Sequence, residues 1–210
     1  FGIWGAIFNL YLGELGYNVD FAGFVFSLSA FATGFMALPA GLLCEGIGRK
    51  RSLLLGILVS NLFYLVQVLT VDSSLILVSS LAAGLVGTIS WVANAPFMME
   101  NSEKEERTYL FSLSWAFMTV AGMVGSLLGG YLPDSFAALV QGQLVLGFRL
   151  TLLCAVVFTF VSVLPLLLIR EKKTSRQKTT QLMAMKNIQS GSTILKLILT
   201  TGLVGFGAGF

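Results

Sequence analysis

Five long, mostly apolar runs dominate the sequence and decide what it can fold into. They cover residues 21–43, 52–71, 75–99, 108–132 and 145–169. A helix of about 20 such residues crosses the hydrocarbon core of a bilayer. Only helices and closed barrels satisfy the backbone polar groups in lipid, and barrel strands alternate polar and apolar residues, which these runs do not. We therefore expect an all-α, polytopic membrane helical bundle.

The composition supports lipid as the solvent. Hydrophobic residues make up 56% of the chain and charged residues only 11%, whereas soluble domains carry about 25% charged residues. Residues 1–12 are apolar as well and are interpreted as the end of a first, truncated span. We predict an N-terminal six-helix transmembrane half at 1–169, a cytoplasmic central linker at 170–191 and the start of a seventh span at 192–210.

Most of the basic residues lie in alternate loops. They are Arg49, Lys50, Arg51, Lys104, Arg107, Arg170, Lys172, Lys173, Arg176, Lys178 and Lys186. The opposite loops hold no Lys or Arg, and Arg149 at the head of the sixth span is the one cation on that side. The positive-inside rule then places the even-numbered loops in the cytoplasm. The net charge of +3 thus reflects topology in a lipid bilayer and not a nucleic-acid partner.

The sequence gives little support for an enzyme. The chain contains no histidine, which excludes His-based triads and HExxH zinc sites. No cluster of Cys, Asp and Glu has metal-ligand spacing. The sequence GFGAGF at 205–210 lacks the preceding strand that a dinucleotide-binding loop requires. We expect no metal, no cofactor and no enzymatic activity.

The loop after the run 21–43 has an ordered pattern, GLLCEGIGRKRS, from Gly41 to Ser52. Its glycines, acidic residue and basic triplet are Gly41, Glu45, Gly48, Arg49, Lys50 and Arg51. The pattern resembles the signature loop of the major facilitator superfamily. Glu45 stands where the family usually has Asp, and Gly46 stands where it commonly has Arg. Gly41 is expected to let two helices approach closely.

The resemblance implies a twelve-span fold of two six-helix halves around a midplane site. This chain would supply the N-terminal half, and the missing C-terminal half of the same chain would be its partner. The resemblance also implies that the 41–51 loop closes the inner gate, with Glu100 and Arg107 in the same gating and interhalf contacts. Ser102 and Glu105 additionally fit a capping box that opens the fifth span.

The fifth span contains AGMVGSLLGG, which is similar to the antiporter signature of that helix in the family. Gly125, Gly129 and Gly130 match it and are expected to mediate helix packing. Ser126 stands where antiporters have proline, and Ser80 lies near the position of an arginine that the fourth span usually carries. Both departures count against proton-coupled drug antiport.

Polar and aromatic residues away from the span ends are the candidates for a substrate cavity, namely Asn9, Trp91, Asn94, Trp115 and Thr119. A primary amide inside a span is costly unless it finds a partner or faces water. Trp91 and Trp115 lie away from the interfaces where aromatic belts would explain them. Packing between helices is the alternative role for all five. Pro96 is predicted to break or bend the fourth span.

Together with the resemblance, these features imply a transmembrane transporter of a small solute that works by alternating access as a secondary carrier. One alternative is a multidrug efflux antiporter that exchanges a coupling proton. An alternative of another class is a non-transporting membrane receptor or scaffold on the same fold. The compact loops favour the plasma (inner) membrane of a bacterium.

Overall fold

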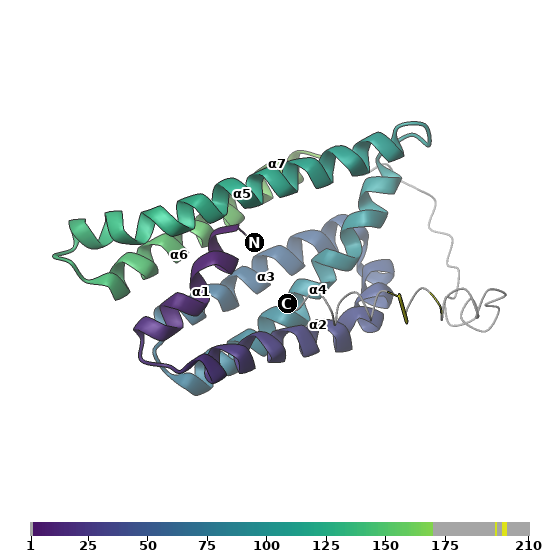
Figure 1. The fold of residues 1–210 in the computed structure, drawn as a ribbon. Coiled ribbons are helices and arrows are strands. Elements are labelled where there is room, and N and C mark those ends of the chain that lie inside the picture. The colour runs from purple at the N-terminus through teal and green to yellow at the C-terminus, as the bar shows by residue number, and fades with distance from the viewer. Residues whose placement is uncertain (1, 170–195, 197–198, 201–210) are drawn as a thin grey trace. The chain divides into compact units, whose positions relative to one another are not determined.

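The computed structural model describes residues 2–169, 196 and 199–200. The chain divides into two units, Phe1–Lys173 and Thr174–Phe210. The helices of the first unit are α1 (Gly2–Glu14), α2 (Val19–Ile47), α3 (Arg49–Leu69), α4 (Ser73–Glu100), α5 (Arg107–Leu139), α6 (Leu144–Val161) and α7 (Val163–Leu168), shown in Figure 1. The predicted linker at 170–191 lies outside the described residues, as does the predicted seventh span apart from residues 196, 199 and 200.

Five segments among the described residues are long and apolar enough to cross a membrane. They are Val19–Ile47, Arg49–Leu69, Ser73–Glu100, Arg107–Leu139 and Leu144–Leu168. Each coincides with one of the five apolar runs of the sequence, so the predicted all-α membrane fold is confirmed. Two of the helices begin at clear caps, since the side chains of Asn18 and Asp72 accept the N–H groups of Phe21 and Leu75.

The fifth span is longer than predicted. The sequence suggested a loop from 133, but α5 continues through Pro133 to Leu139. Pro133 and Ala137 are buried, and a Cβ atom at Gly147 of α6 would collide with both. Close packing against α6 therefore keeps this polar-looking stretch helical. The chain then reverses through Gln141 and Gly142, whose φ angles are 59° and 79°.

The sixth span is divided in two, whereas the fourth is not. The α6 helix ends at Val161 and α7 follows after Ser162, because Pro165 has no N–H group to donate to the carbonyl of Val161. The α4 helix runs through Pro96 to Glu100 without the predicted break, and a bend at Pro96 stays a prediction. Pro96 lies in the last turns of α4.

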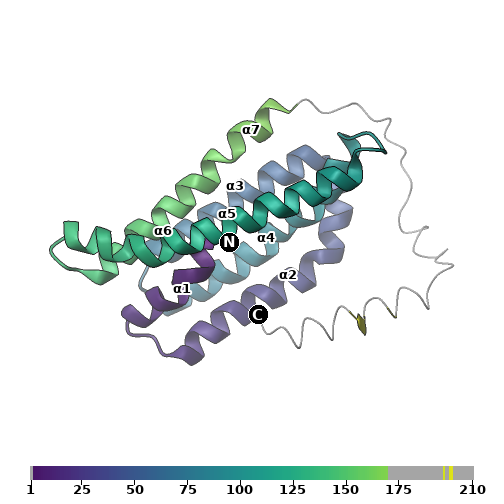
Figure 2. The same cartoon turned by 45° about the horizontal axis from the view of Figure 1, so that its top comes forward.

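Six of the seven described helices pack in two groups of three. The α4 helix lies between α2 and α3, and α1 packs against α5 and α6 (Figure 2). Contacts between α3 and α6 join the groups. The loops 101–106 and Gly48 lie at one end of the bundle, called the basic end after Arg49, Lys50 and Arg107. The loops 15–18, 70–72 and 140–143 lie at the other, called the opposite end.

Close helix contacts explain several glycines. A Cβ atom at Gly84 of α4 would lie 2.5 Å from the carbonyl oxygen of Ser29 in α2. A Cβ atom at Gly56 of α3 would lie 2.6 Å from the backbone nitrogen of Ser90 in α4. Lipid tails provide no hydrophobic force between helices, so such tight packing is a main source of stability in a membrane bundle.

Candidate functional site: the basic end and the exposed polar faces

A single residue, Gly48, connects α2 to α3. Its φ and ψ angles are 104° and 146°, a conformation that residues with a side chain rarely adopt. The Gly48 N–H group donates to the carbonyl of Cys44 at 3.0 Å. Because this turn is so short, Arg49 and Lys50 lie in the first turn of α3, directly beside the ends of other helices.

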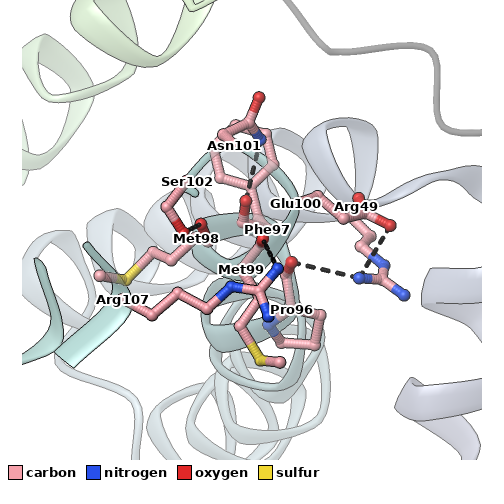
Figure 3. A network of polar contacts seen from close by, with 9 residues as sticks. All are labelled: Arg49, Pro96, Phe97, Met98, Met99, Glu100, Asn101, Ser102 and Arg107. Atoms are coloured by element: carbon pink, nitrogen blue, oxygen red, sulfur yellow. Dashed lines mark hydrogen bonds and ion pairs between the residues drawn. The ribbon is translucent and has the colours of Figure 1, made fainter. Parts of the chain in front are cut away.

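Arg49 binds the end of α4. Its Nη1 atom lies 2.9 Å from Oε1 of Glu100 and 3.1 Å from the carbonyl oxygen of Pro96 (Figure 3). The two charged side chains are each about one-third exposed, at 31% and 32%. Arg49 thus holds α3 to α4 by an ion pair and by a backbone acceptor.

The last carbonyl groups of α4 are capped by side chains. The carbonyl oxygens of residues 96–99 accept hydrogen bonds, in that order, from Arg49, Asn101, Ser102 and Arg107, at 3.1, 2.8, 2.8 and 3.0 Å. Figure 3 shows these donors around the helix end. The end of a helix leaves such groups unpaired and carries a partial negative charge that favours cations. Two of the four donors are cations.

The predicted capping box at Ser102 and Glu105 was wrong. The α5 helix begins at Arg107, and its N-cap residue Glu106 makes no side-chain capping bond. Ser102 instead donates back to Met98, because the end of α4 supplies the nearer unpaired groups. Arg107 spans the loop, and its buried Nε atom has no partner among the described residues.

Lys50 binds the end of α7. Its Nζ atom donates to the carbonyl oxygens of Leu167 and Ile169 at 2.9 and 2.6 Å. Arg51 is exposed and has no hydrogen bond or ion pair within the described part of the chain. Arg49 and Lys50 thus have partners inside this six-helix unit, and the interhalf role expected for them stays a prediction.

The glycines of the motifs differ in their surroundings. Cβ atoms at Gly125 and Gly129 would lie 3.1 and 3.3 Å from Cα atoms of α1, so both lie in the contact between α1 and α5. Gly41 and Gly130 have open space around them. The close helix contacts expected at those two positions do not occur among the described residues. Glu45 is exposed in the last turn of α2.

The predicted cavity residues all lie on exposed faces of α1, α4 and α5. Asn9 and Asn94 are exposed, and the Asn94 amide makes no hydrogen bond within the described residues, while that of Asn9 accepts only the neighbouring N–H group of Leu10. The side chains of Trp91 and Trp115 are 52% and 65% exposed. Thr119 is also exposed and donates to the carbonyl of Trp115.

These residues form a series at different depths and not a single cluster. Asn94 lies six residues before the end of α4, about 9 Å from the basic end. Asn9 lies five residues before the end of α1, about 7.5 Å from the opposite end. Thr119 lies twelve residues into α5, about 18 Å from the basic end and near mid-depth. Their role as cavity residues stays a prediction.

Two further amides inside a span were missed in the sequence. Asn61 and Gln67 of α3 are 1% and 2% exposed. Asn61 donates to the carbonyl of Val156 in α6 at 3.2 Å, while Nε2 of Gln67 has no partner among the described residues. The same rule that singled out Asn94 applies to both, but only the structure separates buried amides from exposed ones.

Comparison with known proteins gives one match. A model of the Major Facilitator Superfamily matches residues 1–210. No curated protein and no solved structure matches the chain. The match covers the apolar spans, the 41–51 loop and the fifth-span glycines together.

Proposed function

The chain belongs to the major facilitator superfamily, a family of membrane transporters, and we propose that it carries a small solute by alternating access. The solute path runs along the exposed polar faces of α1, α4 and α5. The second wall of this path is a further six-helix half of the same protein. Transport is secondary active, driven by an ion gradient, and takes place in the plasma (inner) membrane of a bacterium.

One observation carries this proposal, the contrast between exposed and buried polar groups. Asn9, Asn94 and Thr119 are exposed on α1, α4 and α5, while Asn61 and Gln67 of α3 are buried. An amide that faces hydrocarbon without a partner is costly. The faces with Asn9 and Asn94 are therefore expected to adjoin water, a solute or another protein surface and not lipid tails.

The basic end supplies the proposed gate. The positive-inside rule places it in the cytoplasm. Arg49, Lys50 and Arg107 tie α3 and α5 to the ends of α4 and α7, so this end moves as one body. Glu45 and Arg51 are exposed on its surface, and we assign to them the contacts with the other half when the gate is closed.

The test is solute flux by the intact protein. Efflux-deficient bacteria that express the complete gene are loaded with a cationic dye, and its accumulation is measured with and without a protonophore. If the dye is unaffected, radiolabelled sugars, amino acids and organic acids are screened for uptake. Asn94→Leu serves as the matched variant, because it removes the exposed amide without a change in buried packing.

The outcomes separate the candidate functions. Protonophore-sensitive exclusion of the dye identifies a drug/proton antiporter. Flux of another solute that Asn94→Leu abolishes supports the proposed carrier. If the folded, reconstituted protein moves no solute at all, the proposal fails and a receptor or scaffold on the same fold takes its place.

A further inference from the structure

Arg149 lies inside the sixth span and binds a tyrosine of the first. It is five residues into α6, about 7.5 Å from the helix start. Its Nε atom donates to the hydroxyl of Tyr11 at 2.9 Å. The Tyr11 hydroxyl in turn donates to the carbonyl of Val68 at 2.8 Å. This chain, called the Arg149–Tyr11 link, joins α6, α1 and α3 near the opposite end.

The link compensates a cation inside a membrane span. No carboxylate lies within ion-pair distance of Arg149 in the part of the chain that the structure describes. Val68 is the next-to-last residue of α3, where the helix dipole places a partial negative charge. Tyr11 is fully buried, and its hydroxyl group lies between this negative helix end and Arg149. Ionisable residues inside a span usually have a role in transport, so the link calls for a function beyond packing.

Apolar packing also holds α1 in its rotation, since Ile7, Phe8 and Leu12 are 0–1% exposed and Trp4 stacks on Phe8 and contacts Tyr64 of α3. At the opposite end the link adds a buried polar contact that depends on this rotation. The close contact of Gly2 with Gly125 holds the other end of α1. Rotation of α1 at the opposite end would leave Tyr11 and Arg149 unpaired in a low-dielectric region, which is costly.

Asn9 precedes Tyr11 by two residues, or about 200° around the helix. Tyr11 is buried and Asn9 is exposed, as this angle requires. We infer that Arg149 is a positioning residue: through Tyr11 it fixes the rotation of α1 and thereby holds Asn9 on the solute-facing side. The statement that Asn9 faces the solute rests on the proposed function. The statement that the link fixes the rotation of α1 does not.

The test measures the surroundings of residue 9 directly. A nitroxide spin label is attached to Asn9→Cys in full-length protein that carries Cys44→Ser and Cys154→Ala. The protein is reconstituted in phosphatidylcholine–phosphatidylglycerol vesicles, and collision of the label with a water-soluble nickel chelate and with lipid-soluble oxygen is compared. Tyr11→Phe should shift the ratio of the two from water towards lipid, by about threefold for each lost interhelical hydrogen bond.

Tyr17→Phe is the matched control. Tyr17 follows α1 and also donates to a backbone carbonyl, that of Val71 at 2.6 Å, so the chemical change is the same but lies outside the helix. It should leave the ratio unchanged. Arg149→Leu should shift the ratio in the same direction as Tyr11→Phe. The double variant should shift it no further than Tyr11→Phe alone, since both act through one link.

The results distinguish this inference from the proposed function. An unchanged ratio in Tyr11→Phe, with only a lower thermal stability, would show that the link is merely structural and would overturn the inference. If the label at position 9 collides mainly with oxygen even when Tyr11 and Arg149 are unchanged, the solute-facing role of Asn9 is overturned. The change caused by Tyr11→Phe would still report whether the link fixes α1.

Discussion

At the scale of single residues, cations in this protein bind the carbonyl ends of helices. Arg49 and Arg107 donate to the last turn of α4, and Lys50 donates to residues at and just beyond the end of α7. Such carbonyl groups lack partners in the helix itself, and a cation also stabilises the helix dipole. The Arg49–Glu100 ion pair, by contrast, is partly exposed, and exposed pairs contribute little.

This difference predicts unequal effects for the two partners of the ion pair. Glu100→Gln should lower the free energy of unfolding by less than about 1 kcal/mol. Arg49→Ala should lower it by about 1–2 kcal/mol, because the carbonyl of Pro96 also loses its donor. Thermal unfolding of the purified protein in detergent measures both. Arg51→Ala, which removes an exposed cation with no partner in the described residues, is the control, and equal losses in Glu100→Gln and Arg49→Ala would contradict this explanation.

The sequence identified these cations but not what they bind. The order of glycines, acid and basic triplet singled out Arg49 and Lys50 in advance. Their acceptors are mainly backbone carbonyls 47 to 119 residues away, and a carbonyl group leaves no signature in the residue type. The partner of Arg149 was also missed, because Tyr11 is 138 residues away in the sequence.

At the scale of helices, the apolar runs predicted every described span and their order, because membrane thickness fixes the length of an apolar helix. The ends were less predictable. The extension of α5 to Leu139 depends on packing against Gly147, and the break at Ser162 depends on how Pro165 is accommodated. Pro96 is accommodated within its helix. Such differences arise from tertiary contacts that a single sequence does not reveal.

The contact between α2 and α4 leads to a prediction at this scale. Gly84→Ala should destabilise the protein by about 1–3 kcal/mol, because the added methyl group meets the Ser29 backbone at 2.5 Å. Gly87→Ala is the matched control on the same helix, since its nearest neighbour would be at an ordinary 3.7 Å. Thermal unfolding in detergent compares the two. An equal midpoint for both variants would argue that α2 and α4 separate easily, against the packing described above.

At the scale of the whole unit, α1 and α4 expose the amides of Asn9 and Asn94, while α6 exposes apolar side chains such as those of Val157 and Phe158. The sequence could list candidate cavity residues, because polar groups inside spans are few. It could not tell which of them face outward, since helix rotation is set by contacts such as those of Gly125 with α1. The exposure of Asn9 and Asn94 on separate helices is the observation from which we propose a solute path.

The most direct test of that path is the reactivity of a cysteine at position 94 in the intact, membrane-embedded protein. Asn94→Cys is treated with a membrane-impermeant maleimide, in a protein that carries Cys44→Ser and Cys154→Ala, and Val157→Cys on α6, at a position that is also exposed, is the control. If α4 lines a solute path, Cys at 94 reacts with the reagent from water and Cys at 157 does not. If position 94 is unreactive and both cysteines react only with lipid-soluble reagents, the face of α4 lies in lipid and the proposed transport path is wrong.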